Sequence, residues 1–493
     1  MSEQSGSSEE RHERTELPIE RGFPIERVNE IAEKEGRAKM YYRPIYTMHK
    51  WWARRLGCVF RAISLYTLLD DPEKISVFEP GHEGDTLAGY GDNAANETDI
   101  DVASLIERVD MSDPESLWEL YPKDVRVEDK KILDPFMGGG TSLVEASRFG
   151  AEVVGNDLNP VAWFVTKKEL EAGQTDVEEL EAAFEQVKND VADEITRYYK
   201  TPCPNGDHKA DVMYNFWVKE LDCVSCGHTV PLFKDFRVAA GRYENDNKYN
   251  VLCPDCGSVT LVDDWQSESV CNDCGHGFVP KEGNVSRGGK YTCPDCGQKY
   301  AITDAIREQG SPDLRLYALE YYCEHCDNAG EKKGTYKGYK RTKSQDIELF
   351  NEAKTEWEES EGLHRYVPDE KIPEGAITAA SSISGNDVFQ HGYETWQDMF
   401  TERQLLSLAK LLRSIESVDD QNISEFLLLA ASESLRYTNK MVSYNTTYNK
   451  IGDFFRNNSF TPPTYPVENN VWGAKWGSGT FSAMFDMVKT GVE

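Results

Sequence analysis

Residues 130–160 read KKILDPFMGGGTSLVEASRFGAEVVGNDLNP. KKILDPF has the pattern of a short buried strand, TSLVEASRFG that of a helix closed by Gly150, and AEVVGNDLNP that of a second strand ending in a loop. A strand, a helix and a second strand in this order begin a parallel, doubly wound sheet. The stretch therefore predicts an α/β fold.

Three consecutive glycines lie between the first strand and the helix, at Gly138, Gly139 and Gly140. Without a Cβ they let the backbone approach a ligand closely, and a helix N-terminus offers free N–H groups to a carboxylate or phosphate. Asp157 ends the second strand, where an acid can hold ribose hydroxyls. A glycine run alone could be only a tight turn, but in this context it predicts a nucleoside-bearing cofactor. The loop is neither G-x-G-x-x-G nor a P-loop, which argues against NAD and ATP.

The composition is strongly acidic, with 54 Lys and Arg against 86 Asp and Glu and a net charge of −32. Spread along the whole chain, this charge is typical of a halophilic archaeon with a salt-saturated cytoplasm. In molar salt the Debye length is about 3 Å, so the charge does not exclude a DNA partner. No apolar run of membrane-spanning length and no secretory signal occurs, so we expect a cytoplasmic protein without a membrane partner.

Ten of the twelve cysteines form five C-x-x-C pairs, a spacing that indicates metal in a cytoplasmic protein. Two such pairs make the tetrahedral four-sulfur site that zinc prefers, and closed sites of this kind are structural. Four of the pairs are followed by glycine, as a tight turn requires. The pairs are Cys223/Cys226, Cys253/Cys256, Cys271/Cys274, Cys293/Cys296 and Cys323/Cys326.

Five pairs leave one without a mate, and Cys203 with His208 offers a sixth, irregular half-site. Position 206 is Gly where a regular pair would have Cys, so Asp207, His228 or the more distant His276 stay open as alternative ligands. Pairing in chain order predicts three zinc sites. They are 203/208 with 223/226, 253/256 with 271/274, and 293/296 with 323/326.

A basic and aromatic cluster, HKWWARR, occupies residues 49–55. Basic side chains can hold phosphates while a tryptophan stacks on a base or on a cofactor's adenine. The alternative is an amphipathic helix with both tryptophans in the core and the arginines reaching solvent. The candidate residues for a nucleic-acid or cofactor pocket are His49, Lys50, Trp51, Trp52, Arg54 and Arg55. Nearby Cys58 has no partner in sequence and is expected to be a buried small residue.

DPFMGGGTSLVEA, residues 134–146, resembles the D-P-F-x-G-x-G-T signature of amino-methyltransferases that modify adenine N6 or cytosine N4 in DNA. The resemblance implies S-adenosylmethionine (SAM) as cofactor. It places Asp134, Phe136 and the glycine loop 138–140 at the methionine end, and Asp157 at the ribose.

Five collinear blocks together resemble a family of archaeal and bacterial adenine-specific DNA methylases. That family carries a zinc-ribbon insertion and an N-terminal DUF1156 domain. The resemblance favours adenine over cytosine and implies a Rossmann-like methyltransferase fold. The blocks are LPIERGFPIERVNEI, RPIYTMHKWWARRLG, DPFMGGGTSLVEA, DLNPVAW and TWQDMFTERQLLSL.

The second motif of such enzymes, [DNS]-P-P-[YFW], has one lookalike, TPPTY at 461–465. Thr461 is a poor acceptor for the target amine, and Thr464 stands where the aromatic ring should be. No further parallel strands are evident, so the fold is expected to be incomplete. We therefore expect a SAM-binding part of a DNA methylase whose catalytic half is on a second polypeptide. The alternatives are a non-catalytic zinc-ribbon module that binds nucleic acid, and a truncated remnant.

The spacing of apolar residues predicts a helix over 175–199, capped by Thr175 and Glu178. The order of the features along the chain predicts seven segments. They are a disordered tail (1–16), a DUF1156-like helical segment (17–75), an acidic insertion (76–130), the SAM-binding unit (131–200), a zinc-ribbon array (201–330), a linker (331–395) and a helical region (396–493).

Overall fold

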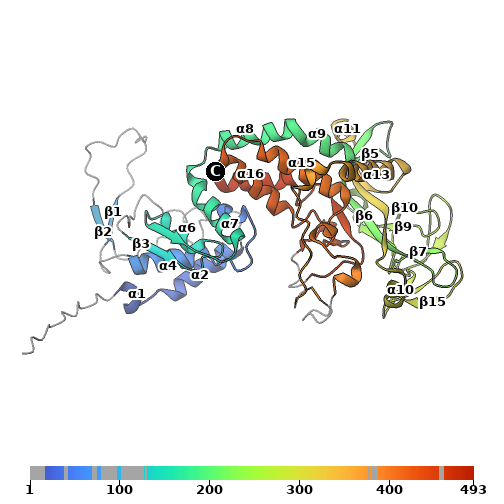
Figure 1. Ribbon diagram of the computed structural model, residues 1–493, viewed down its shortest axis with the longest axis horizontal. Coiled ribbons are helices and arrows are strands. Elements are labelled where there is room, and N and C mark those ends of the chain that lie inside the picture. Colours follow the sequence, from blue (N-terminus) through green and yellow to red (C-terminus); the bar gives the residue numbers. More distant parts are fainter. Residues whose placement is uncertain are drawn as a thin grey trace, which may run out of the picture. The chain divides into compact units, whose positions relative to one another are not determined.

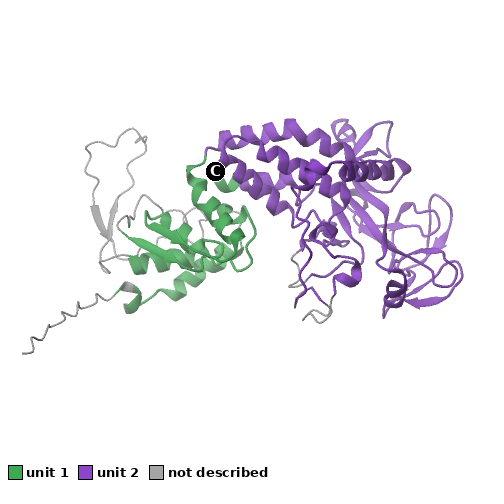
Figure 2. Cartoon of the chain, viewed as in Figure 1, with its two compact units in different colours: residues 1–175, 490–493 green, residues 176–489 purple. Residues whose placement is uncertain are grey.

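The structure, a computed structural model, describes residues 17–37, 43–68, 75–78, 97–100, 127, 130–375, 378–379, 387–454 and 460–493. It forms two compact units, residues 1–175 with 490–493, and residues 176–489 (Figure 2). The predicted tail and most of the predicted acidic insertion lie outside the described residues. In the part that is described, no helix combines the length and apolar character needed to cross a membrane.

The first unit contains the predicted strand, helix and strand. β3 (Lys131–Asp134) and β4 (Glu152–Gly155) pair in parallel, and α6 (Thr141–Ser147) connects them (Figure 1). The α/β prediction is confirmed at this level. The remaining elements are α1 (Pro18–Arg21), α2 (Ile25–Arg37), η1 (Pro44–Thr47), α4 (Gly57–Leu68), β1 (Ile75–Phe78), β2 (Glu97–Ile100), α7 (Pro160–Glu171) and η3 (Ala172–Gln174).

The two faces of the β3–β4 pair differ in burial. Ile132 and Val153 pack on a core that α2, α4 and α6 contribute to, and Cys58 is buried there as expected. On the other face Leu133 is 65% exposed and Val154 is 50% exposed. Strands of parallel sheets are ordinarily covered on both faces. Within the described residues, this sheet has two strands and one covered face.

The second unit begins with the predicted helical run. It is α8 (Val177–Val187), a π-helical turn (Lys188–Ala192), α9 (Asp193–Thr196) and η5 (Arg197–Tyr199). The predicted cap is wrong, because Asp176 caps the helix by accepting from the N–H groups of Glu178 at 2.8 Å and Glu179 at 3.3 Å. The hydroxyl of Thr175 bonds the carbonyl of Glu171 instead.

Longer helices pack together in this unit, with α8, α15 and α16 side by side (Figure 1). The long helices that follow α8 are α13 (Ser344–Glu359), α15 (Glu402–Glu416), α16 (Gln421–Ser434) and α17 (Phe481–Val492). Between them lie the short helix α14 (Glu361–His364) and the turns η7 (Phe389–His391) and η8 (Trp396–Met399). Phe184 of α8 stacks on Phe485 of α17 with ring centroids 3.9 Å apart.

A six-stranded antiparallel sheet is built around the long strand β6 (Lys209–Asp222). Its other strands are β5 (Lys200–Pro202), β7 (Thr229–Pro231), β16 (Asp313–Tyr322), β17 (Lys337–Arg341) and β20 (Val467–Asn469). β17, α13 and α14 lie in residues 331–395, which the sequence predicts to be a linker. β17 has a polar sequence because it is an edge strand, which pairs with β16 on one side only.

The remaining elements of this unit are small sheets and short helices. They are β8 (Arg237–Ala240), η6 (Tyr243–Asn245), β9 (Tyr249–Leu252), β10 (Val259–Val262), β11 (Ser269–Val270), β12 (Gly277–Phe278), β13 (Val285–Ser286), β14 (Lys290–Thr292), β15 (Lys299–Ala301), α10 (Ile302–Gln309), α11 (Glu324–Asn328), α12 (Lys333–Tyr336), β18 (Tyr444–Asn445) and β19 (Lys450–Ile451).

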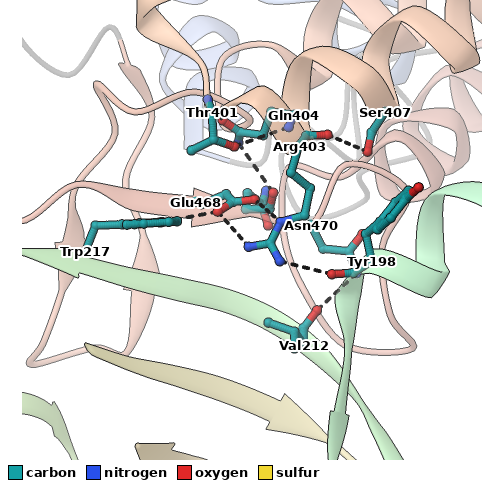
Figure 3. Close-up of polar contacts among 10 residues, drawn as sticks. Tyr198, Val212, Trp217, Thr401, Arg403, Gln404, Ser407, Glu468 and Asn470 are labelled. Carbon is teal, nitrogen blue, oxygen red and sulfur yellow. Dashed lines mark hydrogen bonds and ion pairs between the residues drawn. The ribbon is translucent and has the colours of Figure 1, made fainter. Parts of the chain in front are cut away.

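A buried ion pair joins α15 to β20 (Figure 3). Arg403 donates from Nε to Glu468 Oε1 at 2.7 Å and from Nη2 to Oε2 at 2.8 Å. Its Nη1 donates to the carbonyl of Tyr198 at 3.0 Å, and Trp217 Nε1 donates to Glu468 at 3.1 Å. The two charged side chains are 2% and 0% exposed. This ion pair links helix α15 to strand β20 of the six-stranded sheet.

Candidate cofactor loop and metal centres

The glycine loop turns between β3 and α6 with backbone angles that favour glycine. Gly138 has φ 53° and Gly140 has φ 75°. Asp157 holds the loop from the end of β4, since its Oδ2 accepts from Gly138 N at 2.9 Å and its Oδ1 from Asn159 N at 2.9 Å. These backbone hydrogen bonds, that of Asn159 first, lower the pKa of Asp157 below its usual value. A charged carboxylate is therefore fixed beside the loop.

Asp134 and Phe136 form the turn that precedes the glycines. Asp134 accepts from the N–H of Phe136 at 3.0 Å and from the hydroxyl of Ser142 on α6. The ring of Phe136 is 81% exposed, although large apolar side chains are usually buried. The turn thus leaves an apolar ring exposed at the end of β3.

The basic aromatic cluster contacts the loop and is not helical, because α4 begins only at Gly57. The helical alternative for this cluster is therefore wrong. A Cβ on Gly139 would lie 2.9 Å from Trp51 Cδ1 and 3.1 Å from Arg54 Cζ. Arg54 Nη1 donates to the carbonyl of Gly139 at 2.5 Å. Glycine at this position is required by the close approach of these two side chains.

The other members of the cluster lie apart from this contact. His49 is buried, with its Nδ1 3.1 Å from the carbonyl of Lys50. Trp52 is 50% exposed and Arg55 is exposed. Of the six candidate residues, Trp51 and Arg54 are those that these contacts bring to the glycine loop.

Two buried carboxylates that have no clear sequence signal lie on the helices α6 and α7. Glu169 of α7 is fully buried and pairs with Arg54 at 2.7 Å. Glu145 of α6 accepts from the hydroxyl of Tyr46 at 2.7 Å and from Arg61 at 3.2 Å. Acids on helices ordinarily indicate a solvent face. Only the packing of residues 43–68 on α6 and α7 shows that these two are interior.

Glu169 should make the stability of the fold depend on pH. Burial raises the pKa of Glu169 to about 7, and Arg54 opposes that rise. A carboxyl whose pKa is higher in the folded state than in the unfolded state stabilises the fold most at low pH. This stabilisation falls as the pH rises from the pKa of the unfolded state to about 7, the pKa in the folded state. We expect E169Q to lose this part of the pH dependence of the melting temperature. E152Q, an exposed carboxyl of β4, should keep it, and identical profiles for E169Q and wild type would contradict the assignment.

The twelve predicted metal ligands come together in three groups, each with its ligand atoms within 4.8 Å of one another. The groups are Cys203, His208, Cys323 and Cys326; Cys223, Cys226, Cys293 and Cys296; and Cys253, Cys256, Cys271 and Cys274. The predicted pairing in chain order is right for the last group and wrong for the other two, which are nested. His208 is the irregular ligand, and Asp207, His228 and His276 are in none of the groups.

The antiparallel pairing of β6 with β16 explains the nesting. Tyr322, the last residue of β16, pairs with Asp211 near the start of β6. Cys323, which follows β16, therefore lies close to His208, which precedes β6. The opposite end of β6 leads to Cys223. Chain order predicts the wrong mates because these two strands were not recognised in the sequence.

The geometry of the groups fits a tetrahedral ion. Zn–S bonds of about 2.3 Å imply S···S separations of about 3.8 Å. Sulfur pairs in the groups are 3.6 to 3.8 Å apart, and His208 Nε2 lies 3.1 Å from Cys323 Sγ. The glycines that follow four of the C-x-x-C pairs, here called knuckle glycines, have φ between 71° and 76°, as expected. A Cβ at Gly206 would lie 2.6 Å from Cε1 of His208, so the backbone passes close to the imidazole ring at this position.

The nested pairing can be tested by counting metal. We expect about three zinc ions per chain by elemental mass spectrometry, one for each group. Cys223 and Cys293 share a group, so C223S/C293S should lose one zinc, whereas pairing in chain order requires a loss of two. C58S is the matched control and should lose none.

Comparison with known proteins bears on the N-terminal region. Residues 22–88 match the family model described as "Protein of unknown function (DUF1156)". This part of the chain is therefore similar to the DUF1156 family. The chain is also 33% identical over 110 residues to "Type II methyltransferase M.MvaI" of Kocuria varians. The match covers 21% of this chain and 22% of that relative, so the chain spans about a fifth of the relative's length. No solved structure matches significantly.

Proposed function

We propose that this DUF1156-containing chain is the SAM-binding part of a DNA amino-methyltransferase that acts on adenine N6 rather than cytosine N4. The observation that carries the proposal is the glycine loop held by Asp157 and approached by Trp51 and Arg54. The similarity to a type II methyltransferase supports it. In this proposal β3, α6 and β4 begin a Rossmann-like methyltransferase fold.

The residues around the loop fit SAM in their chemistry. Asp157 is a charged acceptor at the end of β4, suited to ribose hydroxyls. Asp134 and the exposed ring of Phe136 would hold the methionine end. Glycines 138–140 keep the loop free of side chains. When bound, SAM supplies an activated methyl group.

A second chain would complete the enzyme. Leu133, Val154 and Leu158 are 65%, 50% and 95% exposed on and beside the open face of the β3–β4 pair. TPPTY does not end a parallel strand; Tyr465 instead accepts from the backbone N–H of Lys234 at 2.5 Å. The partner would carry the [DNS]-P-P-[YFW] motif, and its surface would cover the open face. The metal centres would hold structural zinc.

Affinity purification from the native host in molar KCl tests the proposal, combined with calorimetric titration of SAM into the full chain. We expect SAM to bind and a partner with an intact [DNS]-P-P-[YFW] motif to co-purify. The pair, and not the chain alone, should methylate DNA. A chain that binds DNA but never SAM would instead be a zinc-ribbon nucleic-acid-binding module. Failure to retain zinc and to fold would indicate a truncated remnant.

A further inference from the structure

A strongly basic segment interrupts the acidic chain. Residues 332–343 contain six Lys or Arg and no Asp or Glu, whereas the whole chain has 54 basic and 86 acidic residues. The segment forms α12 and the edge strand β17, and it follows the metal group that includes Cys323 and Cys326. A local excess of cations on an acidic protein indicates an anionic ligand.

One lysine of this segment lies between two aromatic rings. Lys333 Nζ is 4.8 Å from the ring centroid of Tyr243 and 4.7 Å from that of Trp476. Each of these rings remains 37% exposed. No carboxylate pairs with Lys333 among the residues that the structure describes. Lys333 is one of the charges that lower the pKa of Asp327, and Glu244 accepts from the N–H of the neighbouring Gly334 at 3.0 Å. The surface therefore offers a cation without a direct ion pair, together with two accessible aromatic rings.

The backbone holds Tyr243 in an unusual conformation. Its φ is 58°, in the left-handed region that residues other than glycine rarely adopt. Asn449, with φ 46°, bonds the backbone of Ala240 through its side chain at 2.7 and 2.9 Å. Arg242 donates to the carbonyls of Tyr448 and Asn449. These hydrogen bonds hold the backbone that precedes Tyr243, and a left-handed φ at a tyrosine is the kind of strained conformation that clusters at ligand-binding sites.

A cavity of about 310 Å³ adjoins this surface. Tyr243 and Gly334 belong to its lining, together with Asn245, Asn250 and Asn272 and with two acidic residues, Asp273 and Glu320. Asparagine amides pair well with the edges of bases. An unstacked base next to the rings would find partners there.

We propose that Tyr243, Trp476, Lys332 and Lys333 form a binding surface for an unpaired stretch of DNA. Bases stack on the two rings, while the lysines pair with phosphates. The combination of rings and cations favours a nucleic acid over an acidic peptide, which needs only the cations. The choice of DNA rests on the proposed function, since a methylase must hold a strand with one base out of the stack.

Fluorescence anisotropy of the full chain with a labelled single strand of about 16 nucleotides tests this surface. W476A should weaken binding about 5- to 150-fold. K332E/K333E should lower the slope of log affinity against log salt by between about 1 and 2. The matched control, K290E/K299E, reverses two exposed lysines on the β14–β15 hairpin and should leave binding unchanged. Zinc content confirms that each variant is folded.

Equal losses in K290E/K299E, or an unchanged affinity in W476A, would overturn the proposal. Competition by polyglutamate as strong as that by the DNA strand would also overturn it. SAM titration of the same samples separates this proposal from the previous one. Wild type that binds SAM and no DNA overturns the surface alone. DNA binding through this surface without SAM binding supports the surface and overturns the cofactor site.

Discussion

Replacing Arg403 with methionine should lower the free energy of unfolding by about 3–5 kcal/mol, the cost of leaving a buried charge without its partner. Glu468 is fully buried and takes two of its hydrogen bonds from Arg403. Methionine fills similar space but donates none of these bonds, and the carbonyl of Tyr198 also loses its contact. Urea unfolding in molar KCl, followed by tryptophan fluorescence, measures the change.

Two further variants make the result specific. R365M removes an arginine of similar size whose ion pair with Glu416 is exposed, and the unfolding midpoint should not move. R403M/E468L removes both buried charges and should recover part of the loss, because no charge is then left unpaired. If R403M is no less stable than R365M, the pair does not anchor α15 to β20. If the double variant recovers nothing, packing rather than charge explains the loss.

The parts of the structure that the sequence predicted are those set by neighbouring residues. β3, the glycine turn, α6 and β4 lie within about thirty residues, and each boundary has its own local signal. Asp157 follows from the same rule, since an acid at the end of the second strand lies beside the loop. The knuckle glycines were predictable for the same reason, because each closes a turn begun four residues earlier.

The parts that were missed depend on contacts between distant residues. Ligand pairing in two metal groups follows from the register of β6 with β16, about a hundred residues apart. β6 itself was missed because both of its faces are buried, so its apolar residues do not alternate with polar ones. The ion pair of Arg54 with Glu169 joins residues 115 apart, and neither alone indicates a buried partner.

Replacing Asp157 with alanine should have the largest effect on the cofactor site. A charge-assisted hydrogen bond contributes about 1.5–3 kcal/mol, so its loss should weaken SAM binding about 10- to 150-fold in calorimetric titration. Two causes act together. The ribose loses its acceptor, and Gly138 N and Asn159 N lose the carboxylate that fixes the loop.

D157N separates these two causes. Asparagine has one acceptor oxygen, so it can keep one of the two backbone hydrogen bonds and lacks the charge for the ribose. If the fixed loop matters most, D157N should bind SAM with an affinity between those of wild type and D157A; if the charge matters most, it should resemble D157A. E152A removes an exposed carboxylate from β4, the strand that precedes Asp157, and should bind SAM as wild type does. A folded D157A with wild-type affinity would place the cofactor away from this loop, because no SAM held by Asp157 could be indifferent to the loss of its charge.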